Sequence, residues 1–164
     1  MIIKNVNVYT EDKKFEKGEI IIEDGKFQST SSDSSQIIDG EDCYAIPGLV
    51  DIHFHGCMGY DFCDGTEEAI KEIAKYEASV GVTSIAPATM TISVDELAKV
   101  MEAAGNYKRE YGSKLIGINM EGPFINSEKK GAQDATYIRN CSIEMYRDFQ
   151  KLSGGLIKLV DIAP

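Results

Sequence analysis

Strands and helices alternate over most of this chain, and this order constrains its fold more than any other feature. Helices are predicted to begin after Thr66, Ser93 and Ser142, whose side chains can cap a helix N-terminus. Glu96, three residues after Ser93, completes a capping box. The helices extend to about residues 80, 111 and 152, and strand-like apolar segments occupy residues 48–54, 82–86, 114–120 and 156–162. Such alternation predicts parallel strands joined by right-handed crossovers.

Two α/β architectures accommodate this pattern. Four strands and three helices make half of a (β/α)8 barrel, a fold that usually needs about 250 residues. The chain has 164 residues and reaches Pro164 directly after the fourth predicted strand. A flavodoxin-like open sheet is the alternative, because it also places chemical groups at the carboxyl ends of its strands. We expect an α/β fold and, of the two architectures, an incomplete barrel.

The first 46 residues are expected to form a separate β-structure. Two strand-like segments, IIKNVNVYT and GEIIIEDGKFQST, are followed by a polar run from Ser29 to Gln36 that is predicted as a loop. Asp24-Gly25, inside the second segment, is typical of a hairpin turn. The sequence therefore predicts two domains, residues 1–46 and residues 47–164.

Composition restricts the classes of partner. A formal net charge of −10 and a pI near 4.7 argue against nucleic acid or an anionic membrane. A phosphorylated small molecule remains possible, because a few local cations or a helix N-terminus can hold a phosphate. No segment has the roughly 18–20 consecutive apolar residues of a membrane span, and the N-terminus does not resemble a secretion signal. With no CxxC spacing, we expect reduced cysteines and a cytoplasmic protein.

His53 and His55 are the only histidines, and they lie two residues apart after an apolar segment. In an extended strand, side chains at i and i+2 point to the same face, so the two imidazoles are predicted to converge. Neutral imidazole nitrogens are ligands for zinc, iron and nickel. The simpler interpretation is one buried, hydrogen-bonded histidine and one solvated histidine. The pair therefore indicates a candidate metal site but does not establish one.

Glu121 follows the predicted strand 114–120, so its carboxylate shares a rim with the two histidines. Taken alone, Glu121 is more simply interpreted as a solvated residue at a strand end. Cys57 and Cys63 flank the same region, but loop cysteines of this spacing are more often structural than ligating. Lys129-Lys130 is more simply a solvated pair than a phosphate site.

Three segments carry a family resemblance. PGLVDIHFHGCMGYDFCD resembles the first metal-binding strand of the amidohydrolase superfamily. NMEGPFINSEKKGAQD is more specific, and resembles the EGPF…KKGA signature of N-acetylglucosamine-6-phosphate deacetylases. GGLIKLVDIAP resembles the next strand of that family. The resemblance implies the first half of a metal-dependent (β/α)8 TIM-like barrel, preceded by part of a small β-sandwich.

The resemblance also implies roles for particular residues. His53, His55 and Glu121 match ligands of a divalent metal, zinc or iron. The residues implied to line the sugar pocket are Gly131, Ala132 and Gln133, the last standing where many relatives have a histidine. The family's catalytic aspartate and two further histidine ligands have no counterpart in this sequence. We therefore assign no catalytic residue and expect the chain alone to be inactive.

The implied reaction is hydrolysis of N-acetylglucosamine 6-phosphate to glucosamine 6-phosphate and acetate. The implied partner is this small amino-sugar phosphate, and the complete enzyme is expected to be a homodimer. A dihydroorotase-like hydrolase is a first alternative, but it calls for a lysine at the end of the fourth strand, and Lys158 lies within that strand. A non-catalytic truncated fragment is the second alternative.

Overall fold

The computed structural model describes residues 1–30 and 36–163. The chain divides into an N-terminal unit, Met1–Pro47, and a C-terminal unit, Gly48–Pro164. No helix among the described residues is long and apolar enough to cross a membrane.

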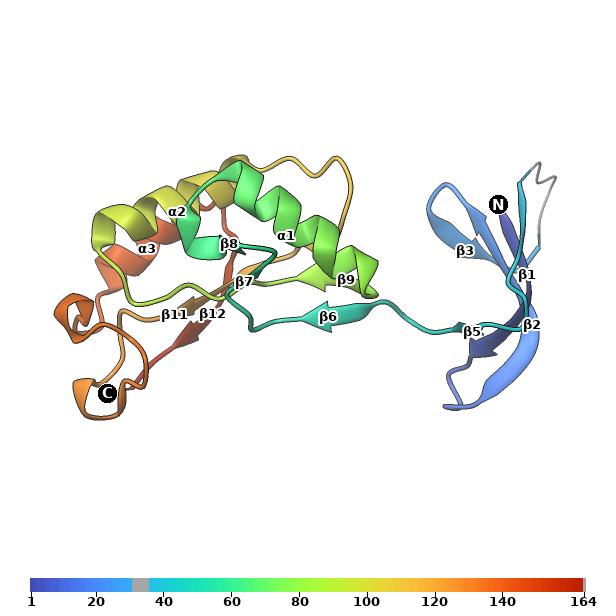
Figure 1. Cartoon of the computed structure of the whole chain (residues 1–164), viewed down its shortest axis with the longest axis horizontal. Helices are drawn as coiled ribbons and strands as arrows, with labels where there is room; N and C mark the ends of the chain where they lie inside the picture. The colour runs from blue at the N-terminus through green and yellow to red at the C-terminus, as the bar shows by residue number, and fades with distance from the viewer. Residues whose placement is uncertain (31–35, 164) are drawn as a thin grey trace. The chain divides into compact units, whose positions relative to one another are not determined.

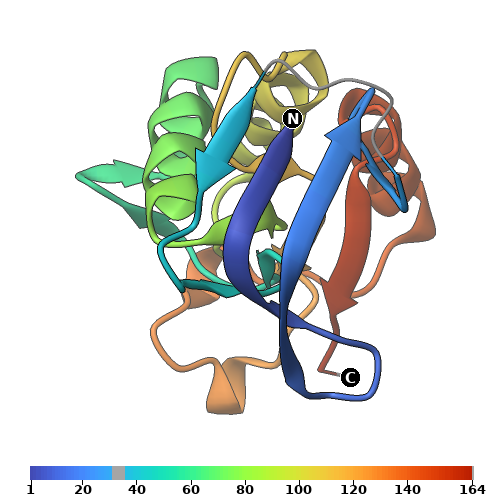
Figure 2. The same ribbon diagram turned by 90° about the vertical axis from the view of Figure 1, so that its right-hand side faces the viewer.

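The N-terminal unit is built on one sheet whose main strands lie side by side in the order β3-β2-β1-β4 (Figure 2). β1 pairs antiparallel with β2 and parallel with β4, and the short β5 also pairs with β1. At the β2–β3 turn, Asp24 and Gly25 have φ of 51° and 72°, as a two-residue hairpin turn requires, so this prediction is confirmed. The predicted loop from Ser29 to Gln36 includes residues 31–35, which lie outside the described residues. The strands are β1 Ile2–Tyr9, β2 Phe15–Glu23, β3 Lys26–Gln28, β4 Ile37–Asp39 and β5 Tyr44–Ala45.

The C-terminal unit alternates parallel strands with helices. β6 pairs with β9, β9 with β10, and β11 with β12, all in parallel. A bridge between Ala88 and Asn119 joins the two sets. The main strands are β6 Leu49–Asp51, β9 Val82–Ile85, β10 Lys114–Leu115, β11 Ile118–Glu121 and β12 Ile157–Asp161. The helices are α1 Glu67–Ser79, α2 Val94–Asn106 and α3 Ile143–Leu152, and the short elements are β7 Gly56–Cys57, β8 Tyr60–Asp61, η1 Phe62–Asp64, η2 Ser127–Lys129 and η3 Ala135–Tyr137.

The helices α1, α2 and α3 of this unit lie on one side of its strands (Figures 1 and 2). α2 contacts both α1 and α3. The strands pair in chain order, whereas a doubly wound sheet reverses its strand order at a switch point. The expected α/β class is confirmed, and the strand order is the one that a (β/α) barrel uses.

The helix starts are as predicted. Thr66 Oγ1 accepts a hydrogen bond from the Ala69 N–H at 3.1 Å. Ser93 and Glu96 form both bonds of the capping box, and Ser142 caps α3. These contacts are local, so the sequence specifies them directly.

The end of α2 and the strand predicted over residues 114–120 differ from the prediction. α2 ends at Asn106 and not near residue 111, because Gly105 and Asn106 are poor helix formers and Tyr107 has an extended backbone (ψ 125°). The predicted strand 114–120 is divided into β10 and β11, with Ile116 and Gly117 between them. The Ile116 N–H still donates to the Ile85 carbonyl at 2.9 Å, so the chain direction continues across the break.

The core lies between the helices and one face of the strands. Leu97 and Met101 of α2 are fully buried with Ile118 and Met120 of β11. Successive side chains of a strand point to opposite faces, so Asn119 and Glu121 point away from this core. The packing of β11 therefore presents these two polar side chains on the face opposite the helices.

Candidate metal centre

The histidine pair lies just beyond β6, in an irregular segment. We predicted a strand over residues 48–54, which includes His53, and its end is wrong, because β6 ends at Asp51. The Asp51 carboxylate accepts the His53 N–H at 3.0 Å and holds a bend there. The segment nevertheless remains beside the chain that follows β9, since the Ala88 N–H donates to the Phe54 carbonyl at 2.7 Å.

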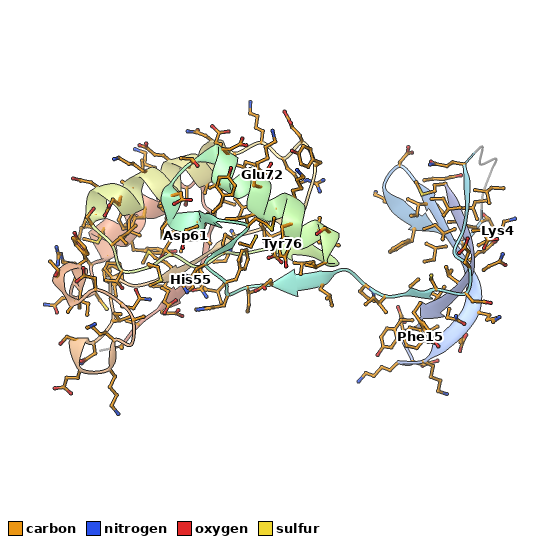
Figure 3. The ribbon with its side chains drawn as sticks, viewed as in Figure 1. Lys4, Phe15, His55, Asp61, Glu72 and Tyr76 are labelled. Carbon is orange, nitrogen blue, oxygen red and sulfur yellow. The ribbon has the colours of Figure 1, made fainter. Side chains whose placement is uncertain are left out.

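The two imidazoles converge on the Glu121 carboxylate. Glu121 Oε2 lies 3.3 Å from His53 Nε2 and 3.2 Å from His55 Nε2. The ring centroids are 5.5 Å apart, and the ring planes are inclined at 84°. His55 lies on the strand side of α1 (Figure 3). One ligand atom from each residue lies within 4.8 Å of the others, so the structure brings together all three residues predicted as ligands.

The donor set fits a divalent cation. Glu121 Oε2 is buried and has no hydrogen-bond partner among the described residues, although both histidine Nε2 atoms lie near it. Ligand bonds of about 2.0–2.1 Å in a tetrahedral site separate neighbouring donor atoms by about 3.3 Å, close to the observed distances. Two imidazoles and one carboxylate make three protein ligands. In a four-coordinate site, three protein ligands leave one position open for water or substrate. The geometry therefore suits a cation placed between the three side chains.

Asn119 is a site residue that our sequence reasoning missed. It is only 4% exposed and lies two residues before Glu121 on β11. Its Nδ2 is 3.0 Å from His53 Nδ1. The sequence signal that could have identified Asn119 is its spacing. An amide two residues before a strand-end carboxylate lies on the same face of the strand as that carboxylate.

The residues predicted to line a sugar pocket are placed differently from one another. Gly131 and Ala132 are exposed, whereas Gln133 is buried at 5% exposure. Gln133 Oε1 accepts the Thr91 N–H at 2.6 Å, and Lys130 Nζ donates to the Gln133 carbonyl at 2.7 Å. The Gln133 amide thus ties this loop to the segment after β9. Its contact with a sugar stays a prediction.

The four cysteines are free thiols. Cys57 and Cys63 do not belong to the His53, His55 and Glu121 group found among the described residues. Cys63 Sγ accepts the Met90 N–H at 3.1 Å. Burial raises the pKa of the Cys63 thiol to about 12, so this side chain remains a protonated thiol.

These observations define an α/β protein with a candidate metal centre at the carboxyl ends of parallel strands. No protein-family model matches the chain. The chain is 30% identical over 175 residues to N-acetylglucosamine-6-phosphate deacetylase from Bacillus subtilis, a match that covers 100% of the chain and 44% of the relative. The resemblance that the EGPF…KKGA motif indicated is confirmed: the chain matches the N-terminal portion of N-acetylglucosamine-6-phosphate deacetylases.

Solved structures show the same relationship. The deacetylase from Thermotoga maritima has a TM-score of 0.73 and 29% identity, over 90% of this chain and 39% of that one. A variant of the Mycobacterium smegmatis deacetylase, in complex with N-acetyl-D-glucosamine-6-phosphate, has a TM-score of 0.83 over 100% of this chain and 43% of that one. Its 19% identity shows a shared fold alone. The chain thus spans less than half the length of these relatives.

Proposed function

We propose that this chain forms the N-terminal part of a metal-dependent N-acetylglucosamine-6-phosphate deacetylase. The enzyme hydrolyses the acetamido group and releases acetate and glucosamine 6-phosphate. The observation that carries the proposal is the convergence of His53, His55 and Glu121 in a chain that matches such deacetylases along its whole length.

In this proposal His53, His55 and Glu121 hold a divalent cation, zinc or iron. Such a cation lowers the pKa of a bound water to about 7 and polarises a carbonyl oxygen. The carboxylate supplies a negative charge, and the imidazoles supply neutral nitrogen donors. The side chains of His53 and His55 are 49% and 35% exposed, which leaves the cation accessible to a substrate.

The loop after β11 supplies the proposed sugar contacts. The exposed backbone at Gly131 and Ala132 faces the substrate, and Gln133 either contacts the sugar or fixes the loop through Thr91. We assign no catalytic acid–base residue within this chain. The isolated chain is therefore expected to bind metal without turning over substrate.

The proposal extends to architecture and setting. The strand order of the C-terminal unit supports the first half of a (β/α)8 barrel, and the N-terminal sheet is proposed as part of a small β-sandwich. We further propose a cytoplasmic enzyme that acts as a homodimer when complete. The strong negative charge supports a small-molecule partner over nucleic acid or a membrane.

The position of Lys158 weighs against a dihydroorotase-like hydrolase. Lys158 is the second residue of β12, and its Nζ donates to the Gly155 carbonyl at 2.8 Å. Glu121 lies instead beside Asp161, the last residue of β12, in the parallel register. The lysine is thus at the opposite end of the strand from the candidate metal centre.

Metal content tests the proposal directly. Zinc-loaded wild type should retain close to one equivalent by mass spectrometry, whereas Glu121→Ala and His53→Ala should each lose most of it. Glu102→Ala, at an exposed position of α2, is the matched control and should bind as wild type does. Equal zinc in all four proteins would remove the proposed ligand set. The complete enzyme should release acetate from N-acetylglucosamine 6-phosphate, and failure to do so would remove the proposed substrate.

A further inference from the structure

The side chain of Asn119 lies behind His53, on the side away from Glu121. Its Nδ2 is 3.2 Å from the Ile52 carbonyl oxygen and 3.0 Å from His53 Nδ1. Its Oδ1 is buried and has no hydrogen-bond partner in the part of the chain that the structure describes. A buried, unpaired amide oxygen is costly, so its presence beside a candidate ligand needs a reason.

The Ile52 carbonyl decides which way the Asn119 amide is turned. A carbonyl oxygen only accepts hydrogen bonds, so the amide atom that faces it is the nitrogen. The same nitrogen reaches His53 Nδ1, which must then be the acceptor. A neutral imidazole that accepts at Nδ1 carries its proton on Nε2, the nitrogen that faces Glu121.

We infer that Asn119 is a positioning residue that orients the His53 ring and selects which of its nitrogens carries the proton. The inference rests on the proposed metal centre. A histidine that gives Nε2 to a cation carries its proton on Nδ1 and needs an acceptor there. The Ile52 carbonyl keeps the Asn119 nitrogen against Nδ1, so Asn119 favours the tautomer with its proton on Nε2 and opposes the proton shift that cation binding at Nε2 requires.

The first test reads the proton position without using activity. Because the chain has only two histidines, long-range proton–nitrogen NMR spectra of the ¹⁵N-labelled chain resolve both rings. In the metal-free wild type at mildly alkaline pH, His53 should be protonated on Nε2. In Asn119→Asp the carboxylate only accepts, so the proton should move to Nδ1. His55 should be unchanged, as should both rings in the control Asn106→Ala, an exposed asparagine at the end of α2.

The second test measures Zn²⁺ binding by titration calorimetry. Asn119→Ala removes the donor to Nδ1, and should tighten Zn²⁺ binding by up to about tenfold. Asn119→Asp replaces the donor with an acceptor for Nδ1–H and should tighten Zn²⁺ binding further, by about 10–100-fold. Circular dichroism checks that each variant is folded, and Asn119→Ser replaces Asn119→Ala if the latter does not fold.

Two results would overturn the inference. One is a metal-free His53 protonated on Nδ1 in the wild type, or a spectrum that Asn119→Asp leaves unchanged. The other is weaker Zn²⁺ binding in both folded Asn119→Ala and folded Asn119→Asp, which would indicate a merely structural residue. The NMR result is independent of turnover: the expected tautomers with no acetate release from the complete enzyme would refute the proposed function and leave the assignment of Asn119 standing.

Discussion

The N-terminal and C-terminal units bury their apolar side chains to very different extents. Among the described residues of the N-terminal unit, the buried apolar side chains are Val6 and Ile21, while Phe27 is 81% exposed. In the C-terminal unit, α2 and β11 enclose a core in which Leu97 and Ile118 have no exposed surface. The N-terminal sheet thus depends on strand pairing and on surface aromatic contacts, whereas the C-terminal unit depends on packing.

Besides strand pairing, the N-terminal unit has aromatic contacts at its surface. The Phe15 ring lies 5.2 Å from the Tyr9 ring and 4.8 Å from the Tyr44 ring, measured between centroids. Tyr44 is still 69% exposed. Such contacts contribute about 0.5–1.5 kcal/mol each, less than a fully buried core side chain contributes. The comparison therefore predicts that substitutions of similar size will differ in cost between the two units.

The largest expected difference is between Leu97→Ala and Phe27→Ala. Leu97→Ala leaves a cavity in the core and should lower the free energy of unfolding by about 2–5 kcal/mol. Phe27→Ala removes an exposed ring and should change it by less than about 0.5 kcal/mol. Urea unfolding followed by circular dichroism and tyrosine fluorescence measures both. Similar losses in the two variants would contradict the comparison.

Two glycines with positive φ provide the next test. Gly122 has φ of 83°, and an added Cβ would lie 2.0 Å from Thr91 Oγ1, so Gly122→Ala should cost about 2–4 kcal/mol through strain and steric overlap. Gly25 in the N-terminal hairpin has φ of 72°, and no atom of the described residues would lie within 4 Å of a Cβ added there. Gly25→Ala should therefore cost only the strain, about 1–2 kcal/mol. Thermal unfolding measures the loss of stability in each variant. An equal loss would mean that the structure relieves the overlap with Thr91 at no cost in free energy.

Thiol reactivity should separate Cys63 from Cys43. The pKa of Cys63 is raised by burial from an ordinary 9.0 to about 12, which lowers its thiolate fraction at neutral pH by about a thousandfold. Cys43, in the N-terminal unit, is exposed. Iodoacetamide labelling followed by peptide mass spectrometry should modify Cys43 long before Cys63 in the folded protein, and urea should abolish the difference. Equal rates in the folded protein would show that Cys63 is not shielded.

Local signals in the sequence predicted the parts of the fold that depend on neighbouring residues. Each predicted cap, at Thr66, Ser93 and Ser142, bonds to a residue three positions away. The grouping of His53, His55 and Glu121 also followed from their positions at or near strand ends. These features require only the periodicity of strands and helices, which a single sequence contains.

Contacts between distant residues were not predictable in the same way. Asn119 contacts a residue 66 positions away, and Gln133 is buried through a bond to Thr91, 42 positions away. Each of these depends on how two separated segments meet. No spacing rule within one segment contains that information.

The smallest expected effects concern two carboxyl groups with opposite pKa shifts. In the C-terminal unit, burial first and the charge of Asp51 second raise the pKa of Glu77 above 4.5. In the N-terminal unit, the Glu41 N–H first and the Asn5 side chain second lower the pKa of Asp39 below 3.8. A raised carboxyl pKa makes ionised Glu77 destabilising above that pKa, and the cost disappears as pH falls below 4.5. The lowered pKa of Asp39 makes its ionised form stabilising above 3.8, and this stability is lost as pH falls through the lowered value.

Neutral substitutions at these two positions should therefore act in opposite directions. At neutral pH, Glu77→Gln should raise the melting temperature relative to wild type, because it removes a charge that burial disfavours. Asp39→Asn should lower it, because it removes a charge that two donors stabilise. Both differences should shrink in acid, each below the pKa range of its own group. Melting curves collected between acidic and neutral pH measure both differences. Shifts of the same sign at neutral pH would contradict the prediction. They would show that burial of Glu77 and hydrogen bonding of Asp39 do not act separately on these two groups.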